Sequence, residues 1–183
     1  MKLDNKGFTV IELILSFILV MFLALSMFAL VNNYRNREQK ESIRRDLLTF
    51  QSTLTGDIYQ DTLERKVDYI RNCEVTNDAI KGCIDIKFLD ETNKELKIVK
   101  EEKTTTEDGT TFTYDSSYIL YGGVKYELPD PKFARIVDDY MFFSTIEEDN
   151  LEYGVIYKIR IRIEHQDLED EFVIEVVTTG INR

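Results

Sequence analysis

The sequence predicts an α+β protein in which one long N-terminal α-helix precedes an antiparallel β-sheet head. An apolar run covers residues 8–31, and apolar side chains then recur at helical spacing between Ile43 and Ile58. Towards the C-terminus the period changes to the alternation typical of strands, most clearly over Val155–Ile163. The predicted parts are a leader at 1–7, a membrane-spanning helix at 8–31, an amphipathic helical stem at 32–71 and a β head at 72–183.

Length and charge set the outer limits. The 183 residues suit one soluble domain of ordinary size together with a membrane helix. The net charge of −11 argues against nucleic-acid binding by the folded head, because phosphate contacts need an excess of cations.

The apolar run from Phe8 to Val31 has the length of a membrane span. Its polar residues are Thr9, Glu12, Ser16 and Ser26. As an α-helix it would be roughly 36 Å long, enough to cross a hydrocarbon core of about 30 Å.

Glu12 is out of place in such a helix. A carboxylate at the bilayer centre costs about 2.5–3.5 kcal/mol, and less towards the edge. A charge carried at that cost indicates a function, so Glu12 is expected to have a charged partner.

The leader differs from a secretory signal peptide. A secretory signal has small residues at a cleavage site after its apolar region, whereas here Gly7 comes before the apolar run. The segment Lys6-Gly7-Phe8-Thr9-Val10-Ile11-Glu12-Leu13 resembles the class III signal of type IV prepilins and pseudopilins.

This resemblance implies roles for three residues. A prepilin peptidase would cut after Gly7 and methylate the new N-terminus at Phe8. Glu12 would neutralise the N-terminal amine of a neighbouring subunit during assembly. The implied partners are other pilin subunits, the peptidase and the assembly machinery in the membrane. The chain would span the cytoplasmic membrane once, N-terminus inside, and then enter an extracellular pilus or pseudopilus.

The cations beside the span favour the opposite orientation. Two lysines precede it, but five basic residues follow it: Arg35, Arg37, Lys40, Arg44 and Arg45. We give the resemblance more weight because those charges lie on a continuing helical stem. The alternative that stays open is a single-pass, membrane-anchored extracellular binding or sensor domain that does not polymerise.

The stem is predicted from a single apolar stripe. Its members are Ile43, Leu47, Phe50, Leu54 and Ile58. Gly56 is a possible bend. Asp61 and Glu64 have the spacing of a capping box for a further short helix with Leu63, Val67 and Ile70 on one face, unless one helix continues to Arg71.

Cys73 and Cys83 are the two cysteines of the chain, and in an exported domain such a pair is more often bonded than free. The loop they would close stabilises a fold by roughly 2.5–3 kcal/mol on the chain-entropy model.

The head is predicted as a series of hairpins. The expected strands are 84–88, 95–99, 111–114, 117–121, 124–128, 136–137, 140–146, 155–163 and 171–178. A charged, Thr-rich loop is expected at 101–109, and Gly122-Gly123 predicts a tight turn. The basic residues of 155–163 are expected to face Glu171 and Glu175 across the last strand pair, in preference to binding nucleic acid.

The order of these elements is similar to that of the larger minor pilins, the PilW-like proteins and the J-type pseudopilins. Tyr118–Gly123 and the C-terminal strand pair carry this second likeness. Many major pilins have a helix-bending proline in the membrane segment; here the first proline is Pro129, which favours a minor subunit. A surface pilus, a type II secretion pseudopilus and a DNA-uptake pseudopilus stay open.

No catalytic motif is expected. His165 is predicted to be exposed and has no Ser or Cys partner in a known motif, so the chain is expected not to be an enzyme. No cofactor is expected. Calcium at 147–152 is the one open alternative, because some pseudopilins of this kind bind it, although the glycine and ligand alternation of an EF-hand are absent.

Overall fold

The computed structural model describes residues 10–75, 77–137, 143–146 and 154–181. The elements are α1 (Val10–Arg65), β1 (Val67–Asn72), β2 (Ile80–Phe88), β3 (Asn93–Glu107), β4 (Thr110–Tyr121), β5 (Val124–Glu127), β6 (Ala134–Ile136), β7 (Phe143–Ile146), β8 (Gly154–His165) and β9 (Phe172–Ile181). The chain forms two units that divide after Ser42. Helix α1 contributes to both, and each unit is described separately.

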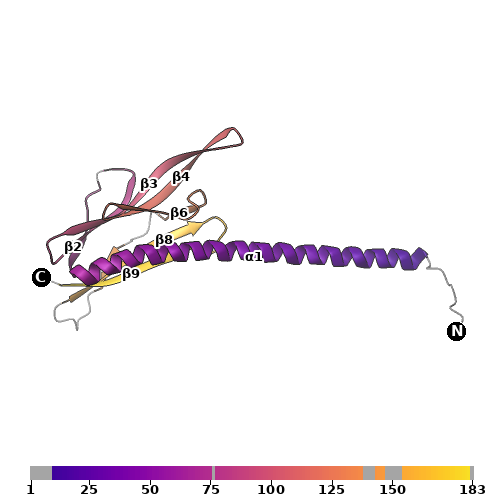
Figure 1. Ribbon diagram of the computed structural model, residues 1–183, viewed down its shortest axis with the longest axis horizontal. Helices are drawn as coiled ribbons and strands as arrows, with labels where there is room; N and C mark the ends of the chain where they lie inside the picture. The colour runs from indigo at the N-terminus through magenta and orange to yellow at the C-terminus, as the bar shows by residue number, and fades with distance from the viewer. Residues whose placement is uncertain (1–9, 76, 138–142, 147–153, 182–183) are drawn as a thin grey trace. The chain divides into compact units, whose positions relative to one another are not determined.

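The second unit is an α+β head, which confirms the predicted fold class (Figure 1). Four side chains of the predicted stripe are buried at the surface where the helix packs on the sheet: Leu47, Phe50, Leu54 and Ile58. They form one core with strand residues such as Ile84, Ile119 and Ile159. The fifth member, Ile43, is partly buried at the margin of this core.

The sheet has the order β5-β4-β3-β2-β1-β9-β8-β6, and β7 pairs with β8. Its ladders are antiparallel except at one place. There β1 runs parallel to β9, with Val67 opposite Gly180. The predicted meander is therefore mixed, because the last strand returns to lie between the first strand and β8.

The helical stem is shorter than predicted. Helix α1 passes through Gly56 and ends at Arg65, where Lys66 adopts a φ of 56° and donates its N–H to the carbonyl of Thr62 at 3.1 Å. Residues 67–72 form β1, so the helical prediction for Val67 and Ile70 was wrong. These side chains are buried, but on a strand, where β-branched residues pack well.

The predicted loop at 101–109 was also wrong over most of its length. Residues 101–107 continue β3, and each pairs with a residue of β4. The turn is confined to Asp108 and Gly109, whose φ values of 50° and 77° suit a two-residue hairpin. Threonines favour strands, and the cross-strand partners outweigh the polar composition.

The hairpin at Gly122-Gly123 is confirmed, since Tyr121 pairs with Val124. The last strand pair is confirmed as well. Lys158 and Arg160 lie 2.7 Å and 3.3 Å from carboxylate oxygens of Glu175. Arg162 lies 3.1 Å from Glu171. These basic side chains are therefore balanced by carboxylates of the neighbouring strand.

Candidate functional site

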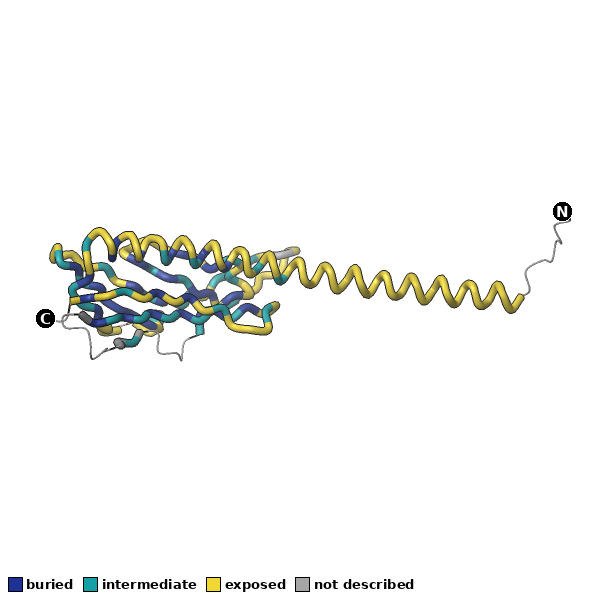
Figure 2. The backbone as a smooth tube through the Cα atoms, turned by 90° about the horizontal axis from the view of Figure 1, so that it is seen from below, coloured by how far each residue is buried: buried dark blue, intermediate teal, exposed yellow. Residues whose placement is uncertain are grey.

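The first unit is a helix whose apolar side chains face outward. Between Val10 and Gln39 every residue is exposed, and Phe22 and Phe28 keep 71% and 73% of their surfaces accessible (Figure 2). An 18-residue window of α1 has a mean hydropathy of 2.8 and contains no buried residue. By length and composition this helix could cross a membrane. A continuous apolar surface of this kind needs lipid or other protein helices around it.

The hydroxyl groups in this segment are satisfied within the helix. Ser16 donates to the carbonyl of Leu13 and Ser26 to that of Phe22, both at 2.9 Å. In an apolar environment such internal bonds remove the cost of an unsatisfied donor. The two serines therefore let the helix lie in lipid or among apolar helices.

Glu12 lies in the first turn of α1 as described, and its residue is exposed. A negative charge there is favoured by the helix dipole by about 0.3–1 kcal/mol. A positively charged group near the same turn would stabilise the Glu12 carboxylate further, in addition to the positive end of the helix dipole. Gly7 and Phe8 lie outside the described residues.

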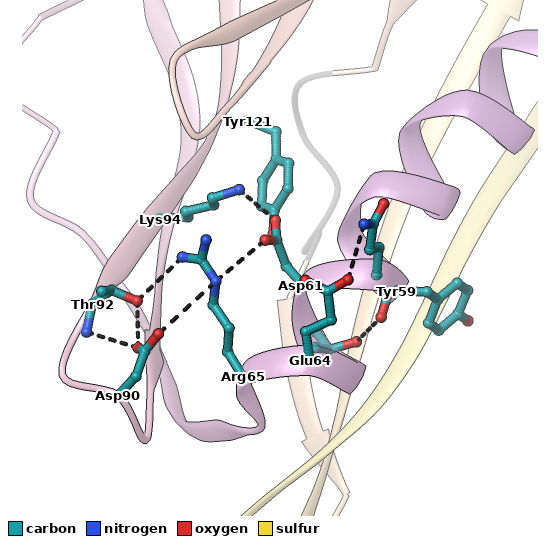
Figure 3. A network of polar contacts seen from close by, with 10 residues as sticks. Tyr59, Asp61, Glu64, Arg65, Asp90, Thr92, Lys94 and Tyr121 are labelled. Carbon is teal, nitrogen blue, oxygen red and sulfur yellow. Dashed lines mark hydrogen bonds and ion pairs between the residues drawn. The ribbon is translucent and has the colours of Figure 1, made fainter.

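A polar network fixes the end of α1 to the sheet of the head (Figure 3). Asp61, which is 8% exposed, accepts hydrogen bonds from Lys94 Nζ at 2.6 Å and from the hydroxyl of Tyr121 at 2.8 Å. Its other oxygen lies 3.7 Å from Arg65 Nε, one helical turn later. Arg65 in turn donates to Thr92 at 3.3 Å. One helix face is thereby connected to β3, β4 and the turn between β2 and β3.

Two tyrosines of this region have perturbed acidities. Burial, together with the Asp61 carboxylate, raises the pKa of Tyr121 well above its ordinary value. Tyr126 donates its hydroxyl to Asp57, and burial and this carboxylate raise the pKa of Tyr126 in the same direction. Both phenols therefore stay protonated as hydrogen-bond donors at alkaline pH.

The network was not predicted from the sequence, where Asp61 was interpreted as a helix cap. In the structure it lies inside α1. The available signal was the recurrence of Asp57, Asp61 and Arg65 at intervals of four, which places three charged groups along one face beside the apolar stripe.

Cys73 and Cys83 form a disulfide bond, with their Cα atoms 5.3 Å apart. The backbone N–H of Cys73 also donates to the carbonyl of Cys83 at 3.1 Å. The bond connects the segment after β1 to β2 and closes the loop that lies between them. The disulfide bond therefore has a structural role in the head, because it holds the segment after β1 against β2.

His165 is buried at 5% exposure, so its predicted exposure was wrong. Its Nδ1 accepts the backbone N–H of Asp167 at 3.1 Å, which leaves the proton of the neutral ring on Nε2. That atom lies 3.9 Å from a carboxylate oxygen of Asp130. Within the part of the chain that the structure describes, no three His, Cys, Asp or Glu side chains are arranged to hold a metal ion. The calcium alternative at 147–152 lies outside that part.

Comparison of the chain with protein-family models, with characterised proteins and with solved structures finds no match.

Proposed function

We propose that the protein is a structural subunit of a type IV pilus or pseudopilus, a minor pilin or pseudopilin. It would enter the filament through its N-terminal helix after cleavage between Gly7 and Phe8. The observation that carries the proposal is the junction Gly7-Phe8 followed by an apolar run whose one ionisable residue is Glu12. An ordinary signal anchor requires the apolar run but does not require the Gly7-Phe8 junction.

The described helix supports this function physically. Its exposed apolar surface from Val10 to Val31 suits lipid before assembly and neighbouring helices after it. Exchange of lipid for protein contacts would let the helix leave the membrane at a small cost. The internal bonds of Ser16 and Ser26 hold in both environments.

Glu12 would act as the register contact. Cleavage creates an amine at Phe8, and methylation leaves that amine cationic. A carboxylate and an amine buried together cost far less than either alone, so assembly would favour the axial position at which Glu12 meets the amine of a neighbour.

Mass spectrometry of the mature protein tests the processing step. The expected N-terminal residue is methylated Phe8, and a mature protein that still begins at Met1 would rule out the proposal. A bulkier residue in place of Gly7, such as Gly7→Leu, should block the cleavage.

Assembly is tested with Glu12 variants and a matched control one turn away. Glu12→Ala should be cleaved as usual but be absent from filaments sheared from cells. Ser16→Ala should be incorporated normally, because its hydroxyl bonds only within the described helix. Normal incorporation of Glu12→Ala would contradict the role of the carboxylate.

A single-pass anchored domain that does not polymerise is the second candidate. It is favoured by the basic residues after the apolar run, which by the positive-inside rule belong in the cytoplasm. Protease added outside intact cells should digest a pilin head and leave a head that faces the cytoplasm intact. Shearing of the cells distinguishes an extracellular anchored domain, which should stay with the cells, from a pilin head, which should leave with the sheared filaments.

A further inference from the structure

The outer half of the β3–β4 hairpin is a ribbon of two strands. Strand β2 pairs with β3 only up to Val99, and β5 pairs with β4 only from Tyr118 onward. Seven further pairs, from Glu101 opposite Ser116 to Glu107 opposite Thr110, continue the hairpin beyond these neighbours (Figure 1). Within the described residues no third strand pairs with either edge of this ribbon. Such edges present backbone donors and acceptors to other chains.

The two edges of the ribbon differ in charge. The β3 edge carries Glu101, Glu102, Lys103 and Glu107, and charges of this kind oppose pairing between edges. The β4 edge has an uncharged run of five strand-forming residues, Thr110-Thr111-Phe112-Thr113-Tyr114. Of the two edges of this ribbon, 110–114 is therefore the less protected against pairing.

We propose that 110–114 is a docking edge for the same segment of a second copy of this chain. Antiparallel pairing centred on Phe112 places the uncharged run opposite itself. Phe112 then meets its counterpart, Thr111 meets Thr113, and Thr110 meets Tyr114. Beyond the run, Asp115 lies opposite Gly109, so no like charges face each other. The same pairing of the β3 edge about Thr104 would place Glu101 opposite Glu107.

The side chains fit this contact. Phe112 is 48% exposed, a large apolar ring at the surface of a ribbon. In the pairing it stacks on its counterpart, with a tyrosine of each copy two residues along on the same face. On the opposite face Thr106 and Thr111 already approach at 3.5 Å between hydroxyls, which continues a threonine surface across the joined edges.

There is room for the partner where the edge meets the rest of the head. A cavity of about 650 Å³ borders Tyr114 and Asp115 and is lined on its other side by β6 and the β8–β9 turn. It carries charges of both signs, including Lys132 and Glu171. The turn of the second copy, Asp108-Gly109, comes opposite Asp115 and Ser116 and can lie at the mouth of this cavity.

The contact is small, so it operates between chains that are already held close together. Five residue pairs bury less surface than a stable dimer in solution needs. A helix that keeps both copies in one membrane or one filament raises their effective concentration. The pairing does not depend on cleavage after Gly7, and it can be tested whether or not the chain is a pilin.

Cysteine cross-linking of the full chain in native membranes provides the test. A chain with Thr111→Cys is co-expressed with a chain carrying Thr113→Cys, because these positions lie opposite each other in the pairing. Opposed Cα atoms are about 4.5–5.5 Å apart, within the range of a disulfide bond. The native cysteines are bonded to each other, so the introduced thiols are the reactive ones. Mild oxidation should give a covalent dimer of this chain.

The matched control uses the other edge of the same ribbon. Thr106 and Thr104 are the cross-strand partners of Thr111 and Thr113. In the proposed pairing the β3 edges are separated by three strand spacings, about 14 Å, so Thr104→Cys with Thr106→Cys should give no dimer. Equal cross-linking of both pairs, no cross-linking of either, or an adduct of 111 or 113 with another protein would overturn the proposal.

A charge variant tests the central residue. Phe112→Lys, added to both chains of the 111 and 113 pair, places two ammonium groups opposite each other and should reduce the cross-linked fraction about fivefold. Thr105→Lys changes the cross-strand neighbour of Phe112 on the β3 edge and should leave the yield unchanged. Resistance of the head to limited proteolysis shows that both variants fold. A folded Phe112→Lys variant that cross-links as before would contradict the proposed edge.

Discussion

Tyr121→Phe should remove part of the alkaline sensitivity of the head. The substitution deletes one hydroxyl from the Asp61 network and leaves the ring in place. At neutral pH the loss of one buried hydrogen bond should cost about 1 kcal/mol, because Asp61 keeps its bond to Lys94.

The pH dependence follows from the raised pKa. An unfolded tyrosine titrates near pH 10. In the folded protein, burial and the Asp61 carboxylate keep Tyr121 protonated well above that pH, so the folded state binds more protons. Its contribution is complete below about pH 10 and is lost as the pH rises towards the folded pKa. At pH 11 the loss is about 1.4 kcal/mol for one such tyrosine.

Urea unfolding of the full chain in a mild detergent measures this effect. Near-ultraviolet circular dichroism at pH 9 and at pH 11 gives the free energy of unfolding for wild type and variant. The difference in unfolding free energy between wild type and Tyr121→Phe should fall by about 1.4 kcal/mol between the two pH values. It should therefore change from about 1 kcal/mol in favour of wild type at pH 9 to about zero, or slightly in favour of the variant, at pH 11. Tyr126→Phe should behave similarly, because burial and Asp57 raise the pKa of Tyr126. An advantage that stays constant from pH 9 to pH 11 would refute the argument for Tyr121.

Three further changes test the head by thermal unfolding. Gly56→Ala should raise stability by about 0.5–1 kcal/mol, because the position is inside α1 with no atom near the added methyl; a lower melting temperature would contradict this. Gly180→Ala should cost about 1–3 kcal/mol, since the added methyl would overlap the ring of Tyr157 at Cε2, and an unchanged melting temperature would show that the ring moves freely. Replacement of Cys73 and Cys83 by Ser should cost about 2.8 kcal/mol on the chain-entropy model, and a loss below 1 kcal/mol would mean that the closed loop is ordered without the bond.

Local periodicity predicted most of the fold. The apolar stripe from Leu47 to Ile58 and the alternation of Val155–Ile163 can each be recognised because one face of the element is apolar. The apolar side chains on that face of both segments are buried in the core. The prediction failed where tertiary partners decide the structure. Residues 67–72 have apolar spacings that suit a helix or a strand, and pairing with β2 selects the strand. Residues 101–107 are polar and become a strand because β4 lies alongside.

The candidate sites divide in the same way. The hypothesis for Gly7, Phe8 and Glu12 depends on residues that are neighbours in one short segment, so it can be formed from the sequence without a structure. The Asp61 network brings together residues 33 and 60 positions apart. Nothing in a single sequence pairs one aspartate with Lys94 and Tyr121 among many charged and aromatic residues. The parallel contact of β1 with β9 is beyond local prediction for the same reason.

The return of β9 to the side of β1 governs when the head can fold. Val67 pairs with Gly180, which lies 113 residues later in the chain, so this pair can form only after β9 has been made. Contacts of such separation fold slowly and leave strand edges open in the meantime. During synthesis the helix and the β1–β5 strands emerge first, and β1 lacks its β9 neighbour until Gly180 has been made. The sheet can therefore close only after β9 has been synthesised, and until then the edge of β1 is open to pairing with other chains.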